Sequence, residues 1–120
     1  MRALLDTNII IEFWKKNPLM LRHLQVFVPN GFIISAATEA ELIVGALNRA
    51  DLQKIRQDLQ LLEVLPLTPA ISQLTSDLLV KYTLSHCLSF TDALIAATAL
   101  HHRLPLFTLN RKDFHYIAGL

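Results

Sequence analysis

The sequence predicts an α/β domain with three layers, in which helices cover both faces of a mainly parallel central sheet. The main observation is an alternation of short apolar runs with longer helical patterns, which is typical of parallel strands joined by helical crossovers. Hydrophobic residues make up 52% of the 120 residues, which is enough for a substantial core, and charged residues make up only 18%. A chain of this length fits one compact unit. We therefore expect residues 1–120 to form a single domain.

The charge balance argues against a globally basic nucleic-acid binder, because the formal net charge is only +1. Any electrostatic contact with a nucleic acid would have to come from a local patch. The single cysteine, Cys87, excludes an internal disulfide, suits a reducing compartment and is expected to be buried. Asp6 interrupts the N-terminal apolar run, which argues against a signal peptide, and no uncharged apolar stretch has the length of a membrane span. We expect a cytoplasmic protein.

Short apolar runs mark the expected strands. They are residues 3–5, 32–34, 64–67 and 106–107. Each run is too short for a stable helix and lies between segments with helical periodicity. Pro66 cannot donate a backbone hydrogen bond, so we expect the third run to lie at an edge of the sheet.

Apolar residues at helical spacing mark the expected helices. These cover residues 9–14, 39–62, 71–82, 90–102 and 111–117. The longest rests on the recurrence of Ile43, Leu47, Ile55, Leu59 and Leu62. The stretch 90–102 is apolar on all sides and rich in alanine, so we expect it to be buried against the sheet.

Four acidic residues fall where an expected strand meets the following helix. Asp6 ends the first strand, and Glu41 lies at the start of the helix after the second. Asp92 opens the alanine-rich helix, and Asp113 opens the last helix. Functional sites in open parallel sheets lie outside the carboxyl ends of the strands. The sequence therefore predicts that these four carboxylates gather at one edge of the sheet.

Helix capping is an alternative explanation for each acid taken singly. Three segments resemble capping boxes, namely Thr38-x-x-Glu41, Ser89-x-x-Asp92 and Asn110-x-x-Asp113. Acids are also common in the first turn of a helix because they interact favourably with the helix dipole. The two explanations are compatible, since a carboxylate at a helix N-terminus is held ionised, which is the form that binds a hard cation.

A group of carboxylates at one place favours a bound divalent cation. Carboxylates that converge repel one another, and they need protonation, solvation or a cation to coexist. Mg²⁺ prefers oxygen ligands, retains several waters and is often held by one or two carboxylates together with phosphate. Since the sequence places no obvious nucleophile beside the acids, they favour metal-assisted attack of water on a phosphodiester.

Four segments resemble, in order, the motifs of the PIN domain family. They read DTN at 6–8, SAATEAELIVG at 35–45, TDALIAATA at 91–99 and TLNRKDF at 108–114, followed by the ending IAGL at 117–120. The small size and the style of the motifs are most similar to the VapC-type toxins of toxin–antitoxin pairs. The resemblance implies a PIN-like fold and an endoribonuclease that depends on Mg²⁺ or Mn²⁺. It also implies a cognate antitoxin protein and frequent homodimers.

The resemblance implies roles for individual residues as well. Asp6 and Asp92 match the metal ligands, and Glu41 completes the acidic group or orients the attacking water. Many relatives place the fourth acid where this chain has Asn110, so Asp113 either substitutes for it or only caps the last helix. The main alternative is a catalytically silent PIN fold that only binds a partner. A phosphatase-like site is disfavoured, because its Asp-x-Asp motif is replaced here by DTN at 6–8.

Polar and basic neighbours extend this hypothesis. Candidates for hydrogen bonds that orient the carboxylates are Thr7, Asn8, Thr108 and Asn110. Candidates for a weak RNA-binding rim are Lys15, Lys16, Arg111 and Lys112. The alternative interpretations are ordinary turn and cap residues for the first set and a solvated surface for the second.

Overall fold

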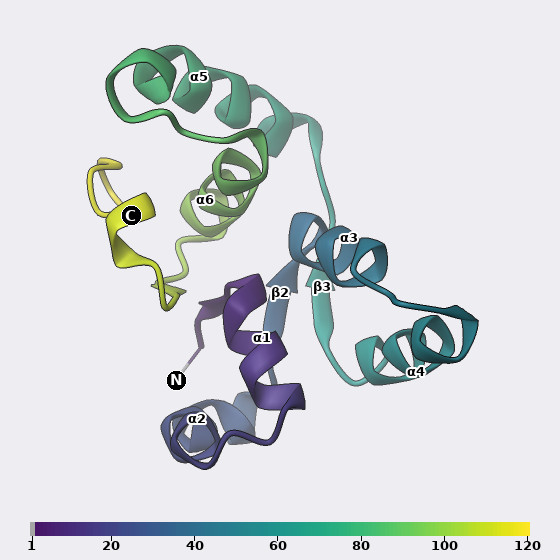
Figure 1. Cartoon of the computed structure of the whole chain (residues 1–120). Coiled ribbons are helices and arrows are strands. Elements are labelled where there is room, and N and C mark those ends of the chain that lie inside the picture. The colour runs from purple at the N-terminus through teal and green to yellow at the C-terminus, as the bar shows by residue number, and fades with distance from the viewer. Residues whose placement is uncertain (1) are drawn as a thin grey trace.

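The computed structural model describes residues 2–120, and a four-stranded parallel sheet lies at its centre (Figure 1). The strands are β1 (Leu4–Leu5), β2 (Ile33–Ser35), β3 (Glu63–Leu65) and β4 (Leu106–Phe107). Their order across the sheet is β3-β2-β1-β4, and neighbouring strands are parallel. The predicted parallel sheet is confirmed. The edge position expected for the third strand is also confirmed, and Pro66 lies just beyond its end.

Helices connect the strands and surround the sheet (Figure 1). In chain order they are α1 (Thr7–Trp14), α2 (Pro18–Leu24), α3 (Ala36–Val44), α4 (Arg49–Leu59), α5 (Pro69–His86) and α6 (Phe90–His102). Two 3₁₀ segments, η1 and η2, cover Gln25–Asn30 and Arg111–Asp113. None of the helices described between residues 2 and 120 combines the length and the apolar character needed to cross a membrane.

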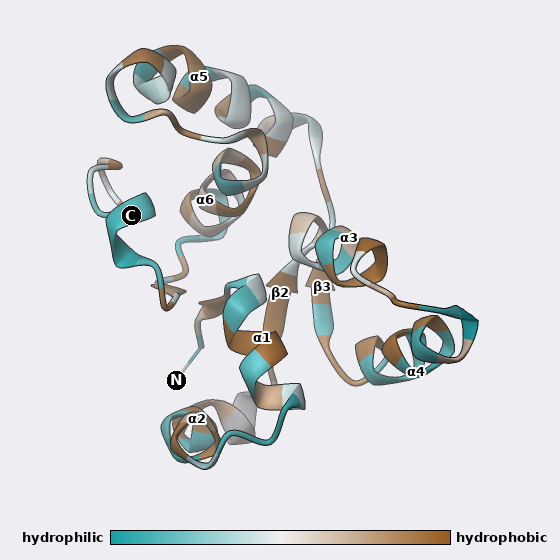
Figure 2. Ribbon diagram, viewed as in Figure 1, coloured by the Kyte–Doolittle hydropathy of each residue, from teal (hydrophilic) through white to brown (hydrophobic). Residues whose placement is uncertain are grey.

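The strands separate two hydrophobic clusters, one on each face of the sheet. Successive strand side chains point to opposite faces. Leu4 and Ile33 belong to a cluster with residues of α5, α6 and the C-terminal segment. Leu5 and Ile34 belong to a cluster with residues of α1, α2 and α4. Figure 2 shows apolar residues along β2, between these two layers of helices. The predicted three-layer α/β/α architecture is therefore confirmed.

The helix predicted for residues 39–62 is wrong in its length, because it is two helices. α3 ends at Val44 with Gly45 as its C-cap, and α4 begins after Asn48, whose side chain accepts a hydrogen bond of 2.8 Å from the Asp51 N–H. Glycine has a low helix propensity and asparagine is a preferred N-cap, so the break has a local cause. Leu47, which the helical pattern included, is 88% exposed in the turn.

The sequence prediction missed α2, although a local signal was present. The side chain of Asn17 accepts hydrogen bonds from the Leu19 and Met20 N–H groups, and Pro18 occupies the first turn. Asparagine as N-cap followed by proline at the first helical position is a recognised helix start. Met20 and Leu24 then bury the inner face of this short helix.

The last predicted helix, residues 111–117, is also wrong. Only Arg111–Asp113 is helical, as the 3₁₀ segment η2, and turns follow it. Asn110 makes no side-chain capping hydrogen bond, so it does not cap this segment as predicted. The residues that follow η2 fix the C-terminal segment instead. Phe114 and Ile117 are buried, and the Tyr82 hydroxyl accepts a hydrogen bond from the Ala118 N–H.

Cys87 is exposed, which corrects the prediction that it is a core residue. It forms the C-cap of α5 in the left-handed conformation, with φ of 54°. The side chain therefore leaves the helix at the point where the chain turns towards α6, while the next residue, Leu88, enters the core.

The alanine-rich helix was predicted with its observed limits, Phe90–His102. Ala93, Ala96, Ala97 and Ala99 are fully buried. We expect Ala96→Leu to destabilise the fold by about 1–3 kcal/mol, because the added carbons have no space in a packed core. Thermal unfolding should show a melting temperature lower by roughly 4–12 °C. Ala70→Leu, on the exposed side of α5, is the matched control, and an equal loss in both variants would contradict close packing as the cause.

Candidate functional site

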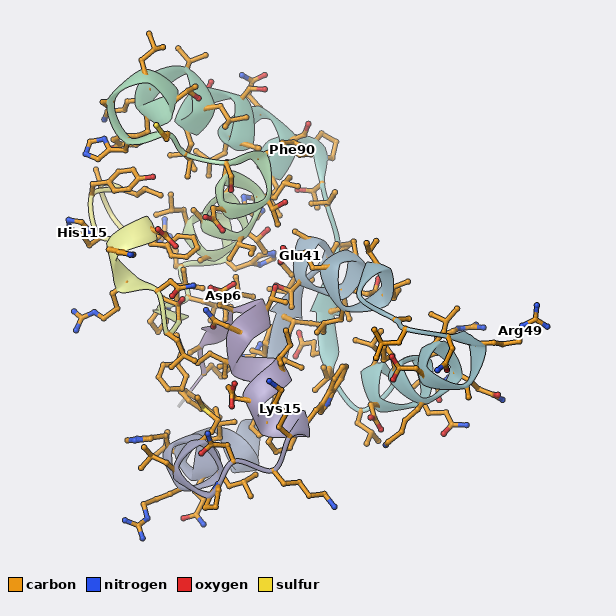
Figure 3. The ribbon with its side chains drawn as sticks, viewed as in Figure 1. Asp6, Lys15, Glu41, Arg49, Phe90 and His115 are labelled. Carbon is orange, nitrogen blue, oxygen red and sulfur yellow. The ribbon has the colours of Figure 1, made fainter. Side chains whose placement is uncertain are left out.

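Polar side chains gather where β1, β2 and β4 end. Asp6 follows β1 directly, Ser35 is the last residue of β2, and Thr108 follows β4. These strands are neighbours in the parallel sheet, so their carboxyl ends meet at one edge. Figure 3 shows Asp6 and Glu41 close to the centre of the molecule, where α1, α3 and α6 converge.

Asp6 is held by hydrogen bonds from the first residue of α1 and from the residue that follows β4. It is only 6% exposed, and as N-cap of α1 it accepts a hydrogen bond of 2.8 Å from the Thr7 N–H through Oδ1. Its other oxygen, Oδ2, accepts a bond of 2.7 Å from the Thr108 hydroxyl. Both oxygens of this carboxylate are thus oriented by groups from α1 and from the end of β4.

The loop after β4 is tied to α1 by three of the residues predicted to support the carboxylates. Besides its bond to Asp6, the Thr108 hydroxyl oxygen accepts a bond of 3.0 Å from the Asn110 N–H. The Asn8 side-chain oxygen accepts a bond of 3.4 Å from the Leu109 N–H. Asn110 therefore contributes through its backbone, and neither asparagine side chain has a hydrogen bond to an acid in the described residues.

Glu41 projects from α3 and is held by α1. The Thr7 hydroxyl donates a short hydrogen bond to Glu41 Oε1. The capping box predicted for Thr38 and Glu41 is wrong, because α3 begins earlier and Ser35 is its N-cap. The Ser35 hydroxyl oxygen accepts a bond of 3.1 Å from the Thr38 N–H. Glu41 lies well inside the helix and remains exposed.

Asp92 is the acid of the site whose pKa is clearly raised. It lies in the first turn of α6, and its N–H donates a bond of 3.1 Å to the Ser89 hydroxyl, as the predicted cap requires. Burial, then the charges of Asp6 and Asp113, raise the pKa of Asp92 from 3.8 to about 6, with a smaller contribution from Glu41. The hydrogen bond from Ser89 opposes this rise. The other three predicted acids therefore all lie within electrostatic reach of Asp92.

The carboxylates do not form a compact set of ligands. Within the part of the chain that the structure describes, no three His, Cys, Asp or Glu side chains lie close enough to hold a metal ion. The expectation that several carboxylates converge closely is therefore too strong. Their chemistry still fits a hard cation, because Mg²⁺ needs only one or two protein carboxylates with water and phosphate. A positive ion beside Asp92 would also relieve the repulsion from Asp6 and Asp113, which adds to the effect of burial in raising its pKa.

Tyr116 also lies near the acids, although the sequence did not predict it as a site residue. Burial raises its pKa, and the charges of Asp92 and Asp113 add to the rise, so the phenol lies near the same acids. Its ring stacks on His86 with a centroid distance of 3.9 Å and contacts Tyr82 edge-on. Nothing in the sequence pattern pointed to Tyr116, because these contacts join α5 to the C-terminal segment.

The basic residues predicted to form a rim separate into two places. Lys15 and Lys16 follow the C-terminal end of α1, and Figure 3 shows Lys15 at the opposite end of that helix from Asp6. A helix of this length spans roughly 12 Å, so these lysines do not border the acids. Arg111 and Lys112 are exposed and share η2 with Asp113, which places them beside the site.

A shallow apolar groove adjoins Glu41. Its volume is about 280 Å³, and it lies between α3 and the start of α6. Ala37, Ala40, Val44 and Phe90 contribute much of its wall. Phe90 is 64% exposed and Val44 is 83% exposed, so apolar side chains border one side of the carboxylates. Figure 3 shows Phe90 at the start of α6, on the same side of the molecule as Glu41.

A three-layer fold around a parallel sheet, with Asp6 at the end of a central strand and Glu41 and Asp92 on the helices beside it, defines a class of small α/β domains with acidic residues at one edge of the sheet. Within this class, the chain belongs to the PIN domain family, whose model matches residues 3–120. No curated protein matches the chain.

Solved structures with the same fold include several toxin–antitoxin complexes. A toxin–antitoxin complex from Klebsiella pneumoniae is 33% identical, with a TM-score of 0.80, and the match covers 98% of this chain and 93% of that one. VapBC-1 from nontypeable Haemophilus influenzae is 27% identical, with a TM-score of 0.82 and coverage of 100% and 95%. VapBC2 from Rickettsia felis, bound to a DNA fragment from its promoter, is 24% identical with a TM-score of 0.83 and coverage of 100% and 96%.

Proposed function

We propose that this protein is a metal-dependent endoribonuclease of the VapC type, the toxin of a toxin–antitoxin pair. The observation that carries the proposal is the environment of Asp92, where burial, then the charges of Asp6 and Asp113 and to a smaller extent Glu41, raise its pKa to about 6. Negative charges close to one another favour a bound cation, and carboxyl groups with shifted pKa values are concentrated at functional sites. Membership of the PIN domain family supports a nuclease.

Asp6 and Asp92 are the residues that would hold Mg²⁺ or Mn²⁺, and Asp113 completes the negative field around them. A bound divalent ion supplies Lewis-acid chemistry, which polarises a phosphate oxygen and lowers the pKa of a bound water. Asp6 is pre-oriented by Thr7 and Thr108. Glu41 is exposed and fixed at one oxygen by Thr7, which leaves its second oxygen free to orient a water molecule.

We infer that the partner is a cognate antitoxin protein and that the toxin acts in the cytoplasm, where its RNA substrate is found. The inference rests on the solved toxin–antitoxin complexes that share this fold. The apolar groove beside Glu41 offers surface for a protein contact next to the acids. A homodimer, which is frequent in such toxins, is part of the same proposal. Arg111 and Lys112 are the basic residues best placed to contact RNA phosphates.

The first test is cleavage of total RNA by the purified protein with Mg²⁺ or Mn²⁺, against the same reaction in EDTA. We expect cleavage only with metal, leaving 5′-phosphate and 3′-hydroxyl ends. Glu41→Gln should reduce cleavage to background. The matched control is Glu39→Gln, because Glu39 lies on the same helix but two residues away, where the side chain points in another direction. Its cleavage should equal that of the wild type.

The outcomes separate the enzyme from a silent binding module. Cleavage that survives EDTA, or that Glu41→Gln leaves intact, would contradict a metal site built on these acids. If the wild type cuts neither total RNA nor separately prepared transfer, ribosomal and messenger RNA, the alternative of a PIN fold that only binds a partner is favoured. Binding of an antitoxin without cleavage would then be its measurable activity.

A further inference from the structure

Behind Glu41 lies a row of three hydroxyl groups that leads from the exposed carboxylate into the core. The Thr7 hydroxyl donates to Glu41, and its oxygen lies 3.1 Å from the Thr38 hydroxyl oxygen. The Thr38 oxygen lies 3.4 Å from the Ser35 hydroxyl oxygen. Thr38 and Ser35 are both fully buried, although α3 does not need the Thr38 hydroxyl for its cap.

The positions of the protons follow from the number each group can donate. A threonine hydroxyl has one proton and two acceptor sites. The Thr7 proton goes to the Glu41 carboxylate, which has none to give, so in the contact between the two threonines Thr38 is the donor and Thr7 the acceptor. The Ser35 hydroxyl can then donate to Thr38 while it accepts from the Thr38 N–H. All three donors thus point towards Glu41.

We propose that Thr38 is a positioning residue for the nuclease reaction: its buried hydroxyl fixes the Thr7 hydroxyl, which fixes Glu41 in the rotamer that orients the attacking water. The inference rests on the proposed function of Glu41. It goes further because it assigns a purpose to a residue that never reaches the substrate side of the site. Donors aligned in one direction polarise one another, so the end of the row binds the carboxylate more strongly.

The structure explains why Glu41 needs such support. Its carboxylate follows three rotatable bonds and is exposed, so it would otherwise sample several positions. Thr7 is the first residue of α1 and Ser35 the last of β2, and both are fixed by regular structure. Thr38 connects the two, since it lies within hydrogen-bond distance of each. Misplacement of a reacting group by about 1 Å can cost about 100-fold in rate.

The test is the steady-state kinetics of Thr38→Val with an RNA substrate and Mg²⁺. Valine keeps the shape but not the hydroxyl, so we expect kcat to fall about 10-fold while KM is unchanged. Thr38→Ser retains the hydroxyl and should restore most of the loss. Thr75→Val is the matched control, because Thr75 is also a buried helix residue, and among the described residues its hydroxyl bonds only to the Ile71 carbonyl, at 2.8 Å. Its kcat should not change.

A double-mutant cycle separates positioning from general damage. If Thr38 acts only through Thr7, then Thr38→Val should have no further effect on kcat when Thr7→Val is already present. Losses that add in the double variant would overturn the proposed route. A fall in kcat for Thr75→Val equal to that for Thr38→Val would overturn it as well.

A measurement without RNA keeps this inference distinct from the proposed function. The side-chain scalar couplings of Glu41 report its rotamer in the metal-free protein by NMR. We expect one dominant rotamer in the wild type and in Thr38→Ser, and averaged couplings in Thr38→Val. A single unchanged rotamer in Thr38→Val would overturn the inference. Absence of RNA cleavage by the wild type would overturn the nuclease proposal, while the couplings would still decide whether Thr38 positions Glu41.

Discussion

Replacing Asp92 by asparagine is expected to abolish RNA cleavage and, at the same time, to stabilise the metal-free protein at neutral pH. The pKa of this carboxyl is about 6 in the folded state, because burial and the neighbouring charges of Asp6 and Asp113 penalise its ionised form. An ionised Asp92 therefore opposes folding above that pH. Asparagine removes the charge and leaves its backbone N–H to bond with the Ser89 cap.

The pH dependence has a definite sign. Since the folded pKa of about 6 lies above the ordinary value of 3.8, the folded state binds this proton more tightly than the unfolded state between these values. The stabilisation from the protonated carboxyl is complete below pH 3.8 and is lost as the pH rises through 6. Because Asp92 is partly exposed, solvent screens its charge. We therefore expect the free energy of unfolding to fall by about 1–2 kcal/mol over this pH range.

Melting temperatures in EDTA between pH 4 and pH 7.5 measure this effect. The wild type should lose roughly 4–8 °C relative to Asp92→Asn across that range. Asp77→Asn, on the exposed face of α5, is the matched control and should follow the wild type. If Asp92→Asn melts below the wild type at neutral pH, the carboxylate is mainly a structural cap. If the variant still cleaves RNA, Asp92 is not a metal ligand.

The parts of the fold that the sequence predicted well are those with a local cause. Short apolar runs locate the strands of a buried parallel sheet, because both faces of each strand must be covered. The start of α6 follows from the N-cap at Ser89, and its alanines have the highest helix propensity of all residues. The false helix across residues 45–48 arose because Ile43 and Leu47 keep a helical spacing by chance, while both are exposed.

The site was predictable in its location but not in its geometry. Topology alone brings Asp6 and Glu41 to the same edge, since they follow neighbouring parallel strands. The distances among the acids depend on how α6 and η2 pack, which no local pattern encodes. For this reason the close convergence expected of the carboxylates was wrong, and the pKa of Asp92 could be obtained only from the folded chain.

Thr38 is a second example of a contact that the sequence pattern could not predict. Its spacing from Glu41 resembled a capping box, and that local interpretation concealed a contact between two helices. A pattern search finds partners three or four residues apart, whereas the bond from Thr7 to Glu41 joins residues separated by 34 positions. Side chains that support a site across elements therefore require the structure.

Asp6 has a structural role as N-cap of α1 and a proposed role as a metal ligand, and two substitutions should separate these roles. Asp6→Ala removes the N-cap of α1 and the acceptor of the Thr108 hydroxyl, so we expect it to destabilise the metal-free protein by about 2 kcal/mol, with about half from the cap and half from the hydrogen bond. Asp6→Asn keeps an oxygen for the Thr7 N–H, and it lowers the repulsion on Asp92. Its melting temperature in EDTA should lie within a few degrees of the wild-type value.

Both Asp6 variants should fail to cleave RNA, because neither presents an anionic oxygen to the metal. Millimolar Mg²⁺ should raise the melting temperature of the wild type by binding the folded state preferentially, and both substitutions should remove that rise. An asparagine variant as unstable as the alanine variant would mean that the negative charge of Asp6, rather than its hydrogen bonds, holds α1 in place. A wild-type protein that Mg²⁺ and Mn²⁺ leave unchanged would contradict a metal site at Asp6, because a ligand that binds only the folded state must stabilise it.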